Sequence, residues 1–179
     1  MNEFGRRFAT AAIILGLFGV AACATPANPV MMTLPATQGL TADPGTPGYR
    51  SVTTVNVAGG QETNPLWVSQ VSDANFKAAL EASLEAANYL GAEGQPTIVN
   101  ATLMALKQPL AGLDLSVTSQ VRYTVTTRGE IVFDELVSAT GTATVGDAFV
   151  ATERLRIANE KSVKENIKQF LTRLRNSMR

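Results

Sequence analysis

The residue types that carry most enzyme chemistry are nearly absent from this sequence of 179 residues. It contains no histidine and a single cysteine, Cys23. Nucleophilic catalysis of the Ser-His or Cys-His type is therefore excluded, and so are zinc sites built on histidine and cysteine. Asp134 and Glu135 are acidic neighbours in a predicted strand, so they point to opposite faces and cannot act together on one substrate. We expect no enzymatic activity, no metal site and no cofactor.

Cys23 closes an N-terminal segment that has the layout of an export signal. Arg6 and Arg7 make the start positive, and an uncharged, largely apolar run of about 14 residues follows, at positions 9–22. Such a segment is typical of a secretory signal peptide, and it is shorter than the roughly 20 residues that a membrane-spanning helix needs. Residues 20–23, Val-Ala-Ala-Cys, resemble the lipobox of bacterial lipoproteins.

This resemblance implies a lipid anchor. In bacterial lipoproteins the cysteine thiol receives a diacylglycerol, the chain is cut just before it, and the new N-terminus is acylated, with fatty acids such as palmitate. Residues 1–22 would then be a lipoprotein signal peptide, and Cys23 the site of lipid attachment. Ala24 follows the cysteine, and by resemblance to enteric lipoproteins the lack of aspartate there implies the outer membrane, with the domain facing the periplasm. The alternatives are an ordinary signal peptide with a chance cysteine, or an uncleaved anchor.

The charge balance gives no sign of a nucleic-acid partner. The chain has 15 basic and 15 acidic residues, and removal of residues 1–22 leaves 13 and 14. A nearly neutral chain lacks the basic footprint that nucleic acid attracts. We therefore expect contact with the membrane through the lipid on Cys23, and no nucleic-acid binding.

A proline-rich segment follows the lipidated N-terminus, so that residues 23–48 are predicted to form a tether. Five of the eight prolines lie here, with three glycines and one charge, Asp43. Dense prolines prevent a long helix and withhold backbone donors from a sheet. A flexible coil of this length would reach about 25 to 30 Å from the membrane. As an alternative, the apolar residues 30–34 could form an edge strand that docks on the domain or on a partner.

Residues 49–179 are predicted to form one periplasmic domain with one core. Period-two alternation and β-branched runs predict strands, and apolar residues at spacings of three and four predict helices. Arg128-Gly129 is typical of a tight hairpin turn, Gly91 is expected to end the first helix, and Gly141 to mark a bulge or bend. The expected elements are strand 51–57, helix 73–90, strand 97–106, strand 113–125, strand 130–144 and helix 148–175.

The predicted order is β-α-β-β-β-α. This indicates an α+β fold, in which a mostly antiparallel four-stranded sheet carries two helices on one face. Together with the lipobox, this order resembles small outer-membrane lipoproteins of Gram-negative bacteria, similar to YajG-like and LptE-type lipoproteins. Residues 59–67 and 146–149 also resemble an uncharacterised lipoprotein family from alphaproteobacteria. Because many functions share this order of elements, the resemblance implies function by analogy alone.

Three residues are candidate contacts with a partner. Trp67 is the only tryptophan, and tryptophans are enriched at interface hot spots, although it could instead plug the end of the core. Leu110 is the apolar tip of a loop that could be a simple connector. Arg122 lies at the centre of the polar face of strand 113–125, and that face could receive a partner or remain solvated.

Two functions of different classes fit these features. The first is an interaction protein, an accessory lipoprotein that docks on an outer-membrane or transport assembly of the cell envelope. The second is a carrier that holds a lipid or glycan between sheet and helices. The carrier needs an apolar cavity beneath the sheet, whereas the accessory protein needs a filled core and an exposed patch.

Overall fold

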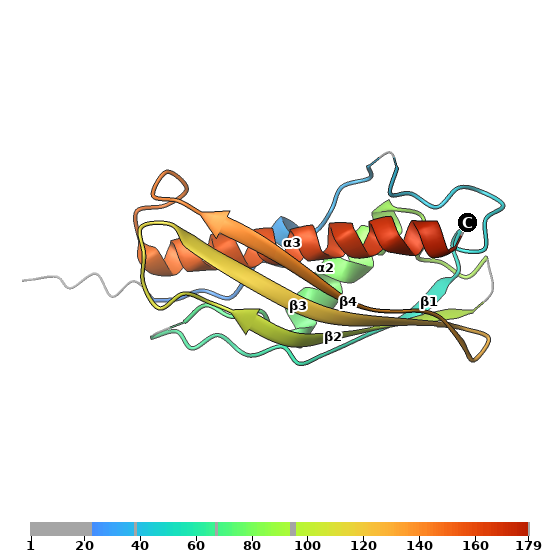
Figure 1. Ribbon diagram of the computed structural model, residues 1–179, viewed down its shortest axis with the longest axis horizontal. Helices are drawn as coiled ribbons and strands as arrows, with labels where there is room; N and C mark the ends of the chain where they lie inside the picture. The colour runs from blue at the N-terminus through green and yellow to red at the C-terminus, as the bar shows by residue number, and fades with distance from the viewer. Residues whose placement is uncertain (1–22, 38, 67, 94–95, 179) are drawn as a thin grey trace, which may run out of the picture.

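The fold is described from a computed structural model, which covers residues 23–178 except positions 38, 67 and 94–95. The expected signal peptide, residues 1–22, lies outside the described residues. Within the described residues, four strands and three helices follow one another (Figure 1). Their bounds are α1 Pro29–Met32, β1 Val52–Ala58, α2 Asp73–Ala86, β2 Thr97–Lys107, β3 Leu115–Thr127, β4 Glu130–Ala143 and α3 Ala151–Ser177.

The strands form one sheet in sequence order, and the α+β architecture agrees with the prediction. β1 runs parallel to β2, with α2 in the crossover between them, while β2, β3 and β4 form an antiparallel meander. The sheet is therefore mixed but mostly antiparallel. α2 and α3 both pack on one face of it, as Figure 1 shows. The other face carries exposed side chains from the alternate strand positions.

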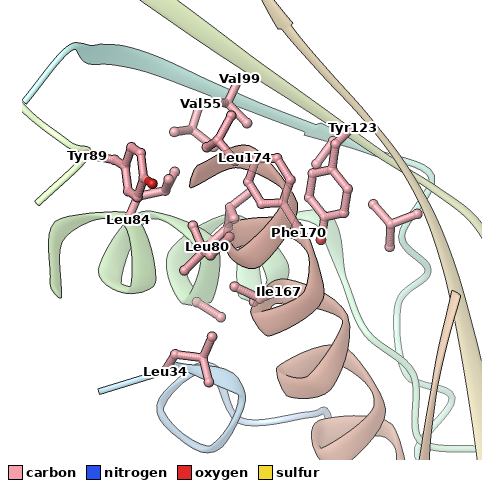
Figure 2. Close-up of a cluster of buried hydrophobic side chains, with 14 of the residues drawn as sticks. Leu34, Val55, Leu80, Leu84, Tyr89, Val99, Tyr123, Ile167, Phe170 and Leu174 are labelled. Atoms are coloured by element: carbon pink, nitrogen blue, oxygen red, sulfur yellow. The ribbon is translucent and has the colours of Figure 1, made fainter. Parts of the chain in front are cut away.

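The space between the sheet and the helices is filled by large side chains. Tyr123 of β3 stacks on Phe170 of α3 with ring centroids 4.0 Å apart, and Phe133 of β4 meets the same ring edge-on. Figure 2 shows Leu80 of α2 beside Phe170, with Leu84 further along the same helix. All five side chains are buried, so helices and sheet share one hydrophobic core.

The helix boundaries differ from the expected ones for local reasons. Ser72 caps α2 by accepting a hydrogen bond from the Asn75 backbone N–H, but α2 ends at Ala86 rather than at 90. Asn88, with φ of 61°, takes the left-handed position after the helix that was expected at Gly91. α3 begins three residues later than expected, because Asp147 closes a turn by accepting the Thr144 backbone N–H at 2.8 Å.

Gly141 does not mark a bulge, because its pairing with Val117 continues the regular register of β3 and β4. At this residue β4 lies directly against the backbone of α3. A Cβ at this position would lie 2.2 Å from the Ser162 backbone nitrogen and 2.6 Å from the Ala158 carbonyl oxygen. Glycine is therefore required for the close packing of the strand against the helix.

The prediction of a flexible tether is wrong for the described residues of 24–48. Five side chains of this segment belong to the core: Ala27, Met32, Leu34, Leu40 and Ala42. Its backbone is also held, since the Leu34 N–H donates to Ser83 Oγ and the Ala42 N–H to the Ala87 carbonyl. The packed domain thus begins at Ala24 rather than at 49.

Residues 30–34 do not form the alternative edge strand either. They include most of α1, a single helical turn that Asn28 caps through its side chain, with Pro29 at the start of the turn. Proline is tolerated there because the first backbone N–H groups of a helix have no partner within it. Prolines thus prevented long elements in this segment, yet its apolar side chains still pack against the domain.

Candidate functional site

Cys23, the predicted lipid attachment site, is exposed and is the first residue that the structure describes. The chain is fixed immediately after it. The Ala24 N–H donates to the Pro65 carbonyl at 2.7 Å, Ser69 Oγ donates to the Thr25 carbonyl at 2.7 Å, and the Ala27 N–H donates to the Gln70 carbonyl at 3.1 Å. The thiol is therefore accessible, but it stands directly on the folded domain.

A buried carboxylate holds the next part of the same segment. Glu160 of α3 accepts the Asn28 backbone N–H at 2.7 Å and pairs with Arg156, which also pairs with Glu153. Burial of Glu160 raises the pKa of its carboxyl, and the hydrogen bond from Asn28 and the charge of Arg156 only partly offset this effect. Sequence reasoning missed the role of Glu160. The i, i+4 spacing of Arg156 and Glu160 was a signal for their ion pair, but nothing in the sequence indicated the contact with Asn28.

Arg122 lies on the open face of the sheet, but Asp134 already satisfies its guanidinium. Its Nε and Nη2 donate to the two carboxylate oxygens of Asp134 at 2.9 and 2.6 Å. This bidentate pair raises the pKa of Arg122 and lowers the pKa of Asp134, to which Thr124 also donates. Arg122 is therefore a rigid, paired group in the middle of the face.

Polar side chains of neighbouring strands bond to each other across the rest of this face. Ser116 meets Thr142 and Thr118 meets Thr140, both at 2.8 Å between hydroxyl oxygens. Large apolar side chains interrupt the polar surface, and two of them, Met104 of β2 and Leu136 of β4, are more than half exposed. The open face is thus an ordered polar surface with apolar side chains on either side of Arg122.

The structure does not bring the candidate contacts together. Leu110 is fully exposed at the tip of the β2–β3 loop, beyond the start of β3. Arg122 lies seven residues into that strand from Leu115, and seven residues of strand span roughly 20 Å or more. Trp67 lies outside the described residues. Leu110 and Arg122 therefore belong to different surfaces.

The described residues contain neither a metal-binding cluster nor a membrane-spanning helix. No group of three or more acidic, histidine or cysteine side chains among them is arranged to hold a metal ion. None of the helices within this part of the chain is long and apolar enough to cross a bilayer.

Comparison with known proteins places the fold. No family model matches the sequence, and no curated protein matches it. A Xanthomonas campestris protein of the DUF330 family has a similar structure, with a TM-score of 0.59 and 10% identity over 86% of this chain and 96% of that one. A candidate lipoprotein from Caulobacter crescentus matches with a TM-score of 0.50 and 13% identity over 72% of this chain and 90% of that one.

At these identities the likenesses establish the fold alone. The more specific resemblance to YajG-like and LptE-type lipoproteins stays a prediction. The chain thus shares its fold with bacterial proteins, one of which is a candidate lipoprotein.

Proposed function

We propose that this protein is a lipoprotein of the outer membrane, acylated on Cys23, which works as an accessory interaction protein of the cell envelope. The open face of the sheet carries this proposal. It is ordered by hydrogen bonds and an ion pair between its own side chains, and it exposes Met104 and Leu136 beside Arg122. A partner that covers this face would bury apolar surface without disturbing the fold.

The rigidity of the face favours binding of a protein. Side chains that are already fixed lose little conformational entropy when a partner covers them. The pair between Arg122 and Asp134 adds a directional charge pattern, which serves specificity more than affinity. The expected partner is therefore an envelope protein with a complementary polar surface.

The carrier alternative is disfavoured by the packing beneath the sheet. Tyr89, Tyr123, Phe76 and Phe170 are among the largest fully buried side chains of the described residues, and they belong to the core that the sheet and the helices share. A carrier would need an apolar cavity there of several hundred Å³. The stacked pair of Tyr123 and Phe170 occupies the centre of that layer.

Site-specific photo-crosslinking in intact cells tests the proposal. A photoreactive residue at Thr102, exposed on the open face, should form one defined adduct with an envelope protein. The same residue at Lys168, exposed on α3, is the matched control and should not form that adduct. Leu136→Glu should abolish the adduct at Thr102, because it places a charge where apolar surface is to be buried.

Two results would overturn the interaction proposal. One is equal adduct formation from Thr102 and Lys168, which would show that the partner does not prefer the open face of the sheet over the exposed surface of α3. The other is a stoichiometric lipid or glycan extracted from the purified protein together with no adduct at either position, which would favour the carrier.

A further inference from the structure

We propose that the end of the domain that carries Cys23 rests on the bilayer, and that apolar side chains of three neighbouring loops enter the membrane interface. This inference rests on the proposed acylation of Cys23 and deepens it, because it names a membrane-contacting surface besides the lipid. The argument starts from the length of free chain between the lipid and the fold.

No spacer separates Cys23 from the packed domain. Ala24 is buried, and its N–H bonds the Pro65 carbonyl. One residue spans at most about 3.6 Å, whereas a coil of 25 residues would have allowed about 25 to 30 Å. A lipid on Cys23 therefore draws this end of the domain to the membrane surface.

Three loops form the end next to Cys23, and Figure 1 shows them gathered where the described chain begins, opposite the C-terminus. The first contains Pro65 and Leu66, and the Pro65 carbonyl accepts the Ala24 N–H. The second is the β2–β3 loop, in which Gln108 Nε2 donates to the Ser69 carbonyl at 2.9 Å. The third is the β4–α3 loop, where Arg154 donates to the Phe149 carbonyl at 2.6 Å.

These loops expose large apolar side chains to an unusual degree. Phe149 is 90% exposed and Leu113 is 77% exposed, and Leu66, Leu110 and Val150 are also exposed. Single exposed hydrophobic residues are ordinary on protein surfaces. A group of them from separate loops, on the side of a lipid anchor, is typical of a membrane contact.

The charges at this end suit an apolar contact. The three loops contain two carboxylates, Asp114 and Asp147, and no basic residue. Asp147 is neutralised by Lys161 at 2.9 Å and accepts the Thr144 N–H. Entry of the loop tips therefore requires little removal of charge from water, and anionic lipid is not needed to attract them.

Quenching by brominated lipids tests this arrangement in the full, lipidated protein. In a Trp67→Phe background, which removes the native tryptophan, one variant carries Phe149→Trp and another Leu110→Trp. The matched control is Ile131→Trp, which is 65% exposed beside the β3–β4 turn at the other end. Each purified protein is reconstituted into vesicles of phosphatidylethanolamine and phosphatidylglycerol with brominated acyl chains.

Tryptophan at 149 and at 110 should lose most of its fluorescence in these vesicles, while tryptophan at 131 should keep it. Fatty-acid labelling of the same samples separates the two proposals. Labelled protein whose tryptophans at 149 and 110 stay bright overturns the membrane contact and leaves the acylation standing. Absence of labelling with quenching at 149 overturns the acylation alone, and absence of both overturns both.

Discussion

At the scale of single residues, a buried polar cluster fixes α3 on the sheet. Ser119 lies among the apolar residues of β3, and its backbone N–H donates to Ser162 Oγ at 2.9 Å. Asn166, one turn further along α3, donates to the Ser119 and Val137 carbonyls and accepts the Tyr123 hydroxyl at 3.0 Å. Because each buried polar group has a defined partner, a shift of the helix along the sheet would leave several of them unsatisfied.

The hydroxyl of Tyr123 makes stability depend on alkaline pH. Burial raises the pKa of Tyr123 well above its ordinary value, so the folded protein favours the protonated form. The resulting stability is complete below about pH 10, where an unfolded tyrosine titrates, and it is lost as the pH rises further. Tyr123→Phe should cost about 1 kcal/mol at pH 7 through the lost hydrogen bond, yet flatten the decline above pH 10.

Urea unfolding at a series of pH values from neutral to alkaline measures this effect. Both proteins contain the same lysines and the same other tyrosines, so the difference between their slopes isolates Tyr123. An equally steep alkaline decline in wild type and Tyr123→Phe would contradict the assignment.

At the scale of elements, a β-bulge decides which face Asp134 occupies. Arg128 and Gly129 both have positive φ, as a two-residue hairpin turn requires. Regular pairing from that turn would set Asp134 opposite Tyr123, on the buried face. A register shift next to Val125 instead pairs Asp134 with Thr124 and brings it within reach of Arg122. A one-residue shift reverses the faces of a strand.

Two neighbouring methionines of α1 test whether this segment is packed on the domain or is a flexible tether. Met32 is fully buried in the core, whereas Met31 is 54% exposed. Met32→Ala should lower the free energy of unfolding by about 2 to 5 kcal/mol, because it removes buried side-chain volume. Met31→Ala, the control, should stay within about 0.5 kcal/mol of wild type.

Urea unfolding of the two variants checks this prediction. A flexible tether would make both substitutions nearly neutral. Equal and small effects of the two substitutions would therefore support the flexible tether that the proline content predicted.

At the scale of the whole molecule, Cys23 and the C-terminus lie at opposite ends. The chain enters the fold at the end with the three apolar loops, and α3 carries it to a C-terminus at the opposite end (Figure 1). An acylated Cys23 would thus direct the open face of the sheet sideways along the membrane rather than away from it. Partners embedded in, or bound to, the same membrane could reach that face.

Fatty-acid labelling and membrane fractionation test the anchor itself. Wild-type protein should incorporate the fatty acid and fractionate with the outer membrane. The residue after Cys23 is Ala24, and by resemblance to enteric lipoproteins the lack of aspartate there implies the outer membrane. Cys23→Ser should lose all labelling and fail to mature, because serine offers no thiol for the diacylglycerol. Labelling that survives Cys23→Ser would refute the lipobox assignment, and recovery of the labelled wild type in the inner membrane would refute the placement.

The sequence alone determined the order of the four strands, α2 and α3, the polar and buried faces of β3, and the position of Cys23, because each depends on local periodicity or on a short motif. It could place Arg122 on the polar face but could not identify Asp134 as its partner, since a bulge sets that register. It also took the prolines of residues 24–48 as a sign of flexibility. Only the tertiary structure decided that this segment packs, because burial of Met32 and Leu34 depends on α2 and α3 lying beside it. That packing places Cys23, the proposed site of lipid attachment, directly on the domain.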